Sequence, residues 1–285
     1  MLVEEHVSVC EDPQVDLFTE RSTGPAERAL LVIHGGPDWD HTYLLEPLAD
    51  LAESRLLVFA DLRGCGRSTV GLPDEAYNPD AATTDLLALL DTLRIERADV
   101  LGFSYGGLLA QRLALAAPQR VRRLIIASSS VVPVPDDAYH DWPEVAQLQA
   151  DGDAVWDALI ADPSPERTRA HALACIPANV WKSESREELR RRLEAVRFSA
   201  EWARPFLAGT LPSGRPEYAL PRLAALGIPT LLLHGRQDMT FPAALAERTA
   251  AEIPNARAIV LDQAGHMAHI DQPEAWLQAI TEFLG

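Results

Sequence analysis

A serine lies between two glycines in the stretch Gly102-Phe103-Ser104-Tyr105-Gly106. The apolar segment 98–101 precedes it, and a pattern with helical periodicity follows at 108–119. In this setting G-x-S-x-G is typical of a sharp strand-to-helix turn that presents a serine hydroxyl as a nucleophile. The free amides at the start of the following helix would favour negative charge that develops at the serine. We therefore predict that Ser104 attacks a carbonyl carbon.

A serine hydroxyl is a weak nucleophile unless a base accepts its proton and an acid orients that base. Asp238 follows the apolar segment 228–234, and His266 follows the segment 256–261. Both would lie past the carboxyl ends of strands, where open α/β sheets build their sites. The sequence therefore predicts a triad in which His266 is the base and Asp238 orients it.

Other acids and histidines also follow strands. Asp262 is only four residues before His266, and we expect it to cap the end of a strand. His269 comes after the turn at Gly265 and is expected to face the inserted segment described below. Three further residues are expected to form hydrogen bonds in turns: His34, His234 and Asp61.

A tetrahedral intermediate would carry an oxyanion, which needs two backbone N–H donors. The first is the amide of Tyr105, directly after the nucleophile. The second must come from the loop after an early strand, and His34-Gly35-Gly36-Pro37 follows the apolar segment 29–33. Glycines there let the backbone approach a substrate closely. Gly36 is the predicted second donor, and Gly35 is the next candidate.

Asp38 and Trp39 directly follow this loop. A carboxylate at Asp38 would attract a substrate ammonium group, but it would serve equally well as an acceptor for backbone amides in a turn after a proline. Trp39 would either line the pocket or pack beneath the inserted segment. The sequence leaves both pairs of alternatives open.

The elements that must position these residues follow from apolar periodicity. Two short strands at 6–10 and 14–20 are expected to form a hairpin, and buried apolar strands then alternate with helical patterns. This alternation predicts an α/β fold with a mostly parallel sheet covered by helices on both faces. Between 133 and 215 only helical patterns separated by prolines occur, so we predict a helical cap at 133–215 inserted into a core of 1–132 and 216–285.

Composition excludes several classes of function. The 285 residues are 47% hydrophobic and carry a formal net charge of −17, which disfavours binding to nucleic acid or to an anionic membrane. The three cysteines are far apart and suggest neither a disulfide framework nor a zinc site. No signal peptide or membrane-spanning run is visible, so a cytoplasmic location is expected. Nothing indicates the oligomeric state.

Three motifs together resemble the proline iminopeptidase group of the α/β-hydrolase fold. They are the loop at 34–37, which looks like the group's HGGP loop, the turn Asp61-Leu62-Arg63-Gly64-Cys65-Gly66-Arg67-Ser68, which looks like its D-x-R-G-x-G-x-S turn, and the elbow at 102–107. Asp238 and His266 complete the order of the triad. The resemblance covers the core on both sides of the cap. One departure is that Asp38 stands where the group usually has a glycine.

The resemblance implies a serine hydrolase that needs no metal or cofactor and removes an N-terminal residue, often proline, from a small peptide or amide. In this group acidic side chains of the cap hold the free amine. Nothing in the sequence selects one of the cap glutamates at 184, 187, 188, 194 and 201; Glu201 stands with Asp38 and Trp39 as a candidate substrate-binding residue.

Several functions are compatible with this triad. The first is hydrolysis of an aminoacyl amide, in a short peptide or an aminoacylated natural product. The second is hydrolysis of an ester or lactone, because one fold supports many substrates. A cofactor-free haloperoxidase activity would use the same residues. A non-catalytic binding protein is disfavoured, because all three triad residues are present.

Overall fold

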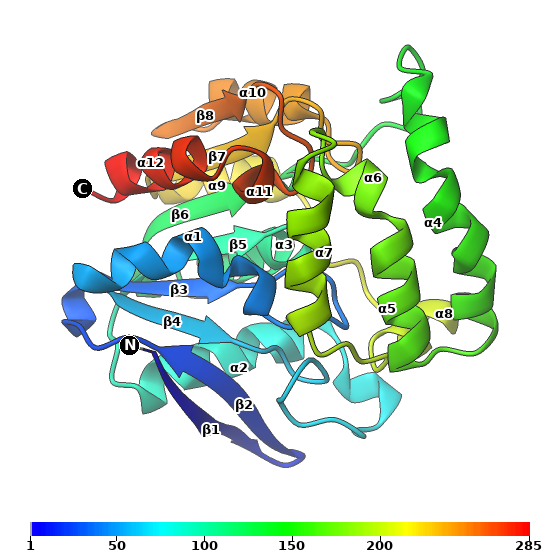
Figure 1. Cartoon of the computed structure of the whole chain (residues 1–285). Helices are drawn as coiled ribbons and strands as arrows, with labels where there is room; N and C mark the ends of the chain where they lie inside the picture. Colours follow the sequence, from blue (N-terminus) through cyan, green and yellow to red (C-terminus); the bar gives the residue numbers. More distant parts are fainter. Residues whose placement is uncertain (1) are drawn as a thin grey trace.

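The computed structural model describes residues 2–285 and contains one sheet of eight strands in the order β1-β2-β4-β3-β5-β6-β7-β8 (Figure 1). The strands are β1 (Val3–Glu11), β2 (Gln14–Arg21), β3 (Ala29–Ile33), β4 (Leu56–Ala60), β5 (Ala98–Phe103), β6 (Val121–Ala127), β7 (Thr230–Gly235) and β8 (Ala256–Leu261). The β1–β2 hairpin pairs antiparallel with β4, and all later pairs are parallel. The predicted mostly parallel sheet is confirmed.

Side chains of the central strands alternate between two apolar clusters, one on each face of the sheet. In β3, Leu31 and Ile33 belong to one cluster, and Leu30 and Val32 belong to the other. All five residues of β3 are buried. Burial on both faces explains why this strand is a continuous apolar run instead of an alternating one.

Helices cover both faces, as the sequence pattern predicts. They are α1 (Leu45–Leu48), α2 (Pro79–Thr92), α3 (Tyr105–Ala116), α4 (Glu144–Ala161), α5 (Pro165–Ala174), α6 (Ile176–Asn179), α7 (Ser185–Ala195), α8 (Ala203–Leu207), α9 (Ala219–Leu226), α10 (Ala243–Glu252), α11 (Ala268–Asp271) and α12 (Pro273–Leu284). Residues of α2, α3, α9 and α10 join the first apolar cluster, and residues of α1, α11 and α12 join the second.

Helix α2 illustrates how local sequence specifies these elements. The side chain of Asn78 accepts a hydrogen bond from the amide of Ala81 at 2.8 Å, and Pro79 occupies the first turn, where its missing N–H is harmless. Leu86 and Leu89 are fully buried at a spacing of three residues, so they share the face that packs on the sheet.

The segment 133–215 forms helices α4 to α8 beyond the carboxyl ends of the parallel strands (Figure 1). Helix α4 starts at Glu144 and includes Gly152 in its interior. In the structure a Cβ on Gly152 would lie 2.5 Å from Cys175 Sγ, so the glycine allows α4 to approach the cap residues after α5.

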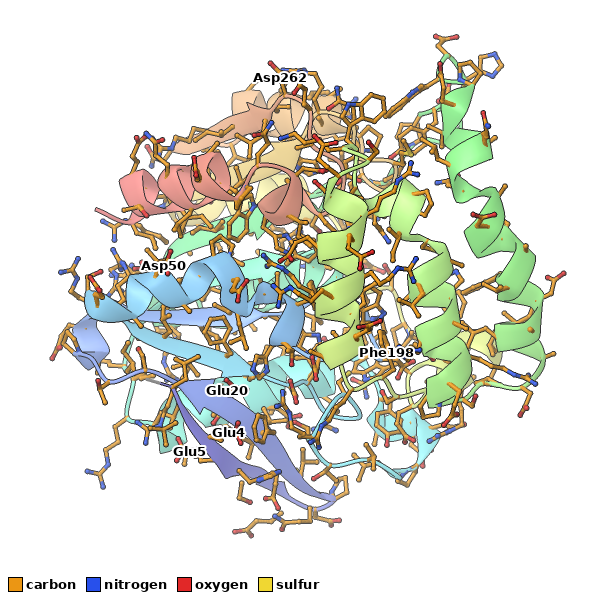
Figure 2. All side chains as sticks on the ribbon, in the orientation of Figure 1. Glu4, Glu5, Glu20, Asp50, Phe198 and Asp262 are labelled. Carbon is orange, nitrogen blue, oxygen red and sulfur yellow. The ribbon has the colours of Figure 1, made fainter. Side chains whose placement is uncertain are left out.

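Charged side chains such as Asp50 and Asp262 lie at the outer surface (Figure 2). Among residues 2–285 no helix has the length and apolar character needed to cross a membrane. Phe198, in the cap segment 196–202 between α7 and α8, packs against Trp39 with 5.5 Å between ring centroids (Figure 2). The cap segment 196–202 therefore contacts the loop that follows β3.

Candidate active site

Ser104 occupies a strained turn between β5 and α3. Its φ of 54° and ψ of −119° are unusual for a residue with a side chain, and its amide donates to the carbonyl of Ala127 at 2.9 Å. A Cβ on Gly102 would lie 2.2 Å from the carbonyl oxygen of Gly106, and one on Gly106 would lie 2.2 Å from that of Ile33. Both glycines are therefore required for this close packing, which presents the serine at the strand end.

The structure brings Ser104, His266 and Asp238 together in one hydrogen-bonded chain. His266 Nε2 lies 3.0 Å from Ser104 Oγ, and His266 Nδ1 lies 3.0 Å from Asp238 Oδ2. The other carboxylate oxygen of Asp238 accepts the amides of Thr240 at 2.7 Å and Phe241 at 2.9 Å. This geometry suits proton transfer from the serine to a histidine that the aspartate orients.

Asp238 is charged despite its complete burial. Burial by itself would raise its pKa, but the neighbouring His266, followed by His234 and the amide of Phe241, holds the pKa of this carboxyl below its ordinary value. His234 Nε2 lies 3.1 Å from the carbonyl of Phe241, which is the turn role expected for it. An ionised Asp238 can accept the Nδ1 proton and stabilise a histidinium.

The competing residues lie elsewhere. The side chain of Asp262 is 76% exposed and pairs with Arg236 at 2.5 Å, so it does not cap the strand as expected. His269 is fully buried, and neither ring nitrogen has a hydrogen-bond partner within residues 2–285. It packs against Phe103 and Trp276, and does not line the pocket beneath the cap. Its helix α11 contacts the cap helix α7, in agreement with the expectation that His269 faces the cap, but packing against Phe103 keeps the ring out of the pocket.

Two amides near Ser104 are free to bind an oxyanion. The amides of Gly36 and Tyr105 make no hydrogen bond among the described residues. Gly36 and Tyr105 both line the cavity that Ser104 lines. Gly36 has a φ of +110°, which favours glycine at this position. The amide of Gly35 instead donates to the hydroxyl of Tyr43 at 2.8 Å. The amide of Gly35 is therefore not available as the second oxyanion donor, and the amide of Gly36 is the better candidate.

Asp38 holds the cap segment around residues 199–203 against the loop that follows β3. Its carboxylate accepts hydrogen bonds from the hydroxyl of Ser199 at 2.9 Å, the amide of Trp202 at 3.0 Å and the amide of Ala203 at 2.9 Å. The residue is only 4% exposed. Burial raises the pKa of Asp38, and these hydrogen bonds oppose the rise. A carboxylate so fully engaged is poorly placed to hold a substrate amine, which argues against that candidate role.

The other two candidates for substrate binding differ from each other. The carboxylate of Glu201 bonds to the hydroxyl of Tyr77 and, at 3.0 Å each, to the amide of Gly71 and the guanidinium of Arg204. It does not line the pocket, so its contacts are those of a structural anchor. Trp39 does line the pocket and also packs on Phe198 of the cap, so both of its expected roles are compatible with its position.

The pocket has a volume of about 600 Å³ and is enclosed mainly by the cap. Helix α4 contributes Trp156, Leu159 and Ile160, and α5 contributes Ala172. Polar cap residues in the lining are Gln149, Asp153, Thr168, His171, Cys175 and Asn179. Sequence reasoning did not single out any of these. A usable signal was present, since the lining residues of each helix recur at spacings of three and four and so share one face.

Asp61, in the turn that follows β4, forms a buried ion-pair network behind the loop at 34–41. Its carboxylate lies 2.6 Å from His41 Nδ1 and 3.2 Å from Arg67 Nε, and His41 Nε2 lies 3.4 Å from Glu20 Oε1. Burial alone would lower the pKa of His41, but the hydrogen bond to Asp61 and the charge of Glu20 raise it to about 9. His41 is therefore a buried cation near neutral pH.

We expect this network to make stability fall at alkaline pH. The folded-state pKa of His41 lies above its unfolded value, so its contribution is complete below about pH 6.5 and is lost as the pH rises through about 9. The loss should be roughly 3 kcal/mol in the free energy of unfolding. Urea unfolding at pH 6 and pH 9.5 measures it, with His41→Gln as the comparison. An equal change between the two pH values in both proteins would contradict the assignment.

Residues 28–273 match the family described as alpha/beta hydrolase fold. A putative carbamate hydrolase RutD of Pseudomonas savastanoi is 28% identical over 277 residues, which are 91% of this chain and 95% of that protein. A 2-hydroxymuconate semialdehyde hydrolase of Pseudomonas sp. is 30% identical (90% and 86% covered), and a proline iminopeptidase of Levilactobacillus brevis is also 30% identical (90% and 87% covered).

Proposed function

The chain belongs to the alpha/beta hydrolase family, and from that membership we propose that it is a serine hydrolase that cleaves an uncharged carboxylic ester or lactone through an acyl-enzyme. The observation that carries this proposal is the hydrogen-bonded chain from Asp238 through His266 to Ser104, at the base of a largely apolar pocket. The three relatives named above act on different substrates, so the substrate is argued from the pocket of this chain.

In the first half of the reaction Ser104 Oγ forms a bond to the carbonyl carbon, while its proton passes to His266 Nε2. The carbonyl oxygen becomes an oxyanion, which the amides of Gly36 and Tyr105 stabilise. The intermediate then collapses, the bond to the leaving oxygen breaks, and His266 gives its proton to that oxygen. The products are an alcohol and an ester of Ser104; from a lactone the hydroxyl stays on the acyl group.

In the second half a water molecule takes the place of the leaving group. His266 Nε2 accepts a proton from the water as its oxygen attacks the acyl carbon. The second tetrahedral intermediate collapses with cleavage of the bond to Ser104 Oγ, which recovers its proton from His266. Asp238 remains ionised throughout and stabilises the histidinium that forms in each half.

The lining of the pocket favours an uncharged substrate. Its apolar surface comes from Trp156, Leu159, Ile160 and Phe206. The carboxylate of Asp38 is already hydrogen-bonded to Ser199 and Ala203 of the cap. Binding a free ammonium group in this mainly apolar pocket would cost desolvation energy, and of the two lining aspartates only Asp153 has a carboxylate that no described residue engages. An ester of a small apolar acid carries no charge, so its desolvation costs little free energy when it enters this pocket. Such an ester therefore fits this site best.

A free-amine aminoacyl amide, as in proline iminopeptidases, is the second candidate, and one observation favours it. Asp153 lines the pocket, is exposed, and forms no ion pair within residues 2–285. Trp156, one turn along α4, also lines the pocket, and an indole face attracts cations. In this version Asp153 would hold the amine, while Ser104, His266 and Asp238 keep the roles described above.

Three matched substrates separate the two candidates by kcat/KM. They are a simple acyl ester such as a p-nitrophenyl butyrate, an alanine or proline amide with a free amine, and the same amide with its amine acetylated. We expect the ester to be turned over fastest. Rapid cleavage of the free-amine amide, lost on acetylation and in Asp153→Asn, would replace the ester proposal with the aminopeptidase one. Ser104→Ala serves as the blank for all three.

A further inference from the structure

Gly35 lies between the nucleophile and a buried tyrosine hydroxyl. Its amide donates to Tyr43 Oη at 2.8 Å, and Tyr43 is 1% exposed. A Cβ on Gly35 would lie 2.9 Å from Ser104 Cβ and 3.0 Å from Tyr43 Oη. The tyrosine hydroxyl therefore holds the amide side of Gly35 at the point where the loop passes the nucleophile.

The carbonyl side of the same glycine is held by His34. Its Nδ1 lies 2.6 Å from the carbonyl oxygen of Gly35, and its Nε2 accepts the amide of Leu62 at 3.0 Å. Because Nε2 is an acceptor, the ring proton must be on Nδ1, from which it is donated to Gly35. Burial lowers the pKa of His34 and keeps the ring neutral, as an accepting Nε2 requires.

These two contacts determine where the next amide points. The peptide bond between Gly35 and Gly36 is trans, so its C=O and N–H point in opposite directions. With the carbonyl directed at the buried ring of His34, the N–H of Gly36 is directed away from that ring. Gly36 is exposed there and lines the cavity together with Ser104.

We propose that Tyr43 and His34 are positioning residues which, by holding both sides of Gly35, aim the amide of Gly36 at the oxyanion. This inference rests on the proposed function, because it takes Gly36 as an oxyanion donor. Neither side chain exchanges a proton with the substrate. Their effect is on the geometry of one N–H, and such a donor acts far more strongly on the tetrahedral intermediate than on the bound substrate.

Tyr43→Phe removes the hydroxyl and leaves the ring in place. Loss of a whole oxyanion donor costs about 10²- to 10³-fold in kcat, so a misaimed donor should cost about 10- to 100-fold. We expect kcat on the ester to fall by that factor while KM changes less than about threefold. Tyr218→Phe makes the same substitution at a residue that is 80% exposed and outside the pocket, and it should leave both constants unchanged.

Phenylboronic acid tests the geometry without turnover. Ser104 Oγ forms a bond to boron, its proton passes to His266, and the tetrahedral adduct places an oxygen where the oxyanion would be. The dissociation constant is measured by tryptophan fluorescence. In Tyr43→Phe it should rise by the same factor by which kcat/KM falls. An unchanged dissociation constant, or a raised KM with unchanged kcat, would overturn the proposal and assign Tyr43 to structural support only.

The boronate measurement also separates this inference from the proposed function. If the wild-type protein binds the boronate and Ser104→Ala does not, yet no ester is hydrolysed, the substrate assignment fails while the ratio of dissociation constants still tests Tyr43. Equal boronate affinity of wild type and Ser104→Ala would overturn both.

A pair of variants tests the other side of Gly35. His34→Asn retains an N–H donor near the position of Nδ1, whereas His34→Leu has none. Each is expected to lower kcat, with the smaller loss in His34→Asn, and circular dichroism establishes which of them fold. An equal kcat loss in two folded variants would contradict the role of the Nδ1 proton, and the Tyr43→Phe result stands independently if His34→Leu does not fold.

Discussion

Ser104→Ala is expected to lower kcat by about 10⁵-fold or more while the protein keeps its fold. The substitution removes the oxygen that lies 3.0 Å from His266 Nε2, so no acyl-enzyme can form. It leaves the backbone turn and its two glycines unchanged, so the melting temperature should move by no more than about 2 °C. Initial rates on the ester, with active-site titration of the wild type, measure the loss.

Ser129→Ala is the matched control for this prediction. Ser129 is buried just beyond the end of the next strand, and its hydroxyl has no hydrogen-bond partner within residues 2–285. The same atom is removed a short distance along the same edge of the sheet, and kcat should remain close to that of the wild type. Activity in Ser104→Ala within tenfold of the wild type would exclude the proposed mechanism, because no other residue has been assigned the role of nucleophile.

His266→Leu is expected to be as severe as the loss of the serine, with kcat lower by about 10⁵-fold or more. Removing the imidazole takes away the acceptor for the serine proton and the donor for the leaving group at once. Rates across pH 5 to 9 should stay near the background, since no other base is hydrogen-bonded to Ser104 among the described residues.

His269→Leu makes the same substitution three residues away and should change kcat by less than about tenfold. Neither ring nitrogen of His269 has a hydrogen-bond partner in the described part of the chain, and the ring packs against Phe103 and Trp276. Replacing an unpartnered buried polar group by an apolar one of similar size is nearly neutral for stability. If His269→Leu were the inactive variant and His266→Leu the active one, the choice of base would have to be reversed.

Strands and long helices could be predicted because their signals are local. A parallel strand that is buried on both faces is a short apolar run, as in β3. The helix α2 is indicated by its N-cap at Asn78 and by leucines at helical spacing. Some residues inside these elements are set by tertiary contacts instead of by helix propensity. Gly152 lies inside α4 because Cys175 leaves no room for a side chain there, and a helix propensity cannot anticipate such a contact.

The residues of the triad could also be selected from the sequence, because each follows a recognisable strand and the carboxyl ends of parallel strands meet at one edge of the sheet. Their choice over Asp262 and His269 depended on position alone. In the structure Asp262 pairs with Arg236 and His269 is enclosed behind Phe103, so neither competes for Ser104.

The amino-acid sequence by itself therefore determined the sheet, the order of its helices and the candidate nucleophile, base and acid, since these depend on local periodicity and on short motifs at strand ends. Only the tertiary structure decided what surrounds them. Asp38 is engaged by Ser199 and Ala203, and Gly35 by Tyr43, through contacts that side-chain type alone does not specify. The pocket, too, is formed by cap helices that are distant in sequence from Ser104. Tertiary packing determines which polar groups are hydrogen-bonded within the protein and which remain available to a substrate.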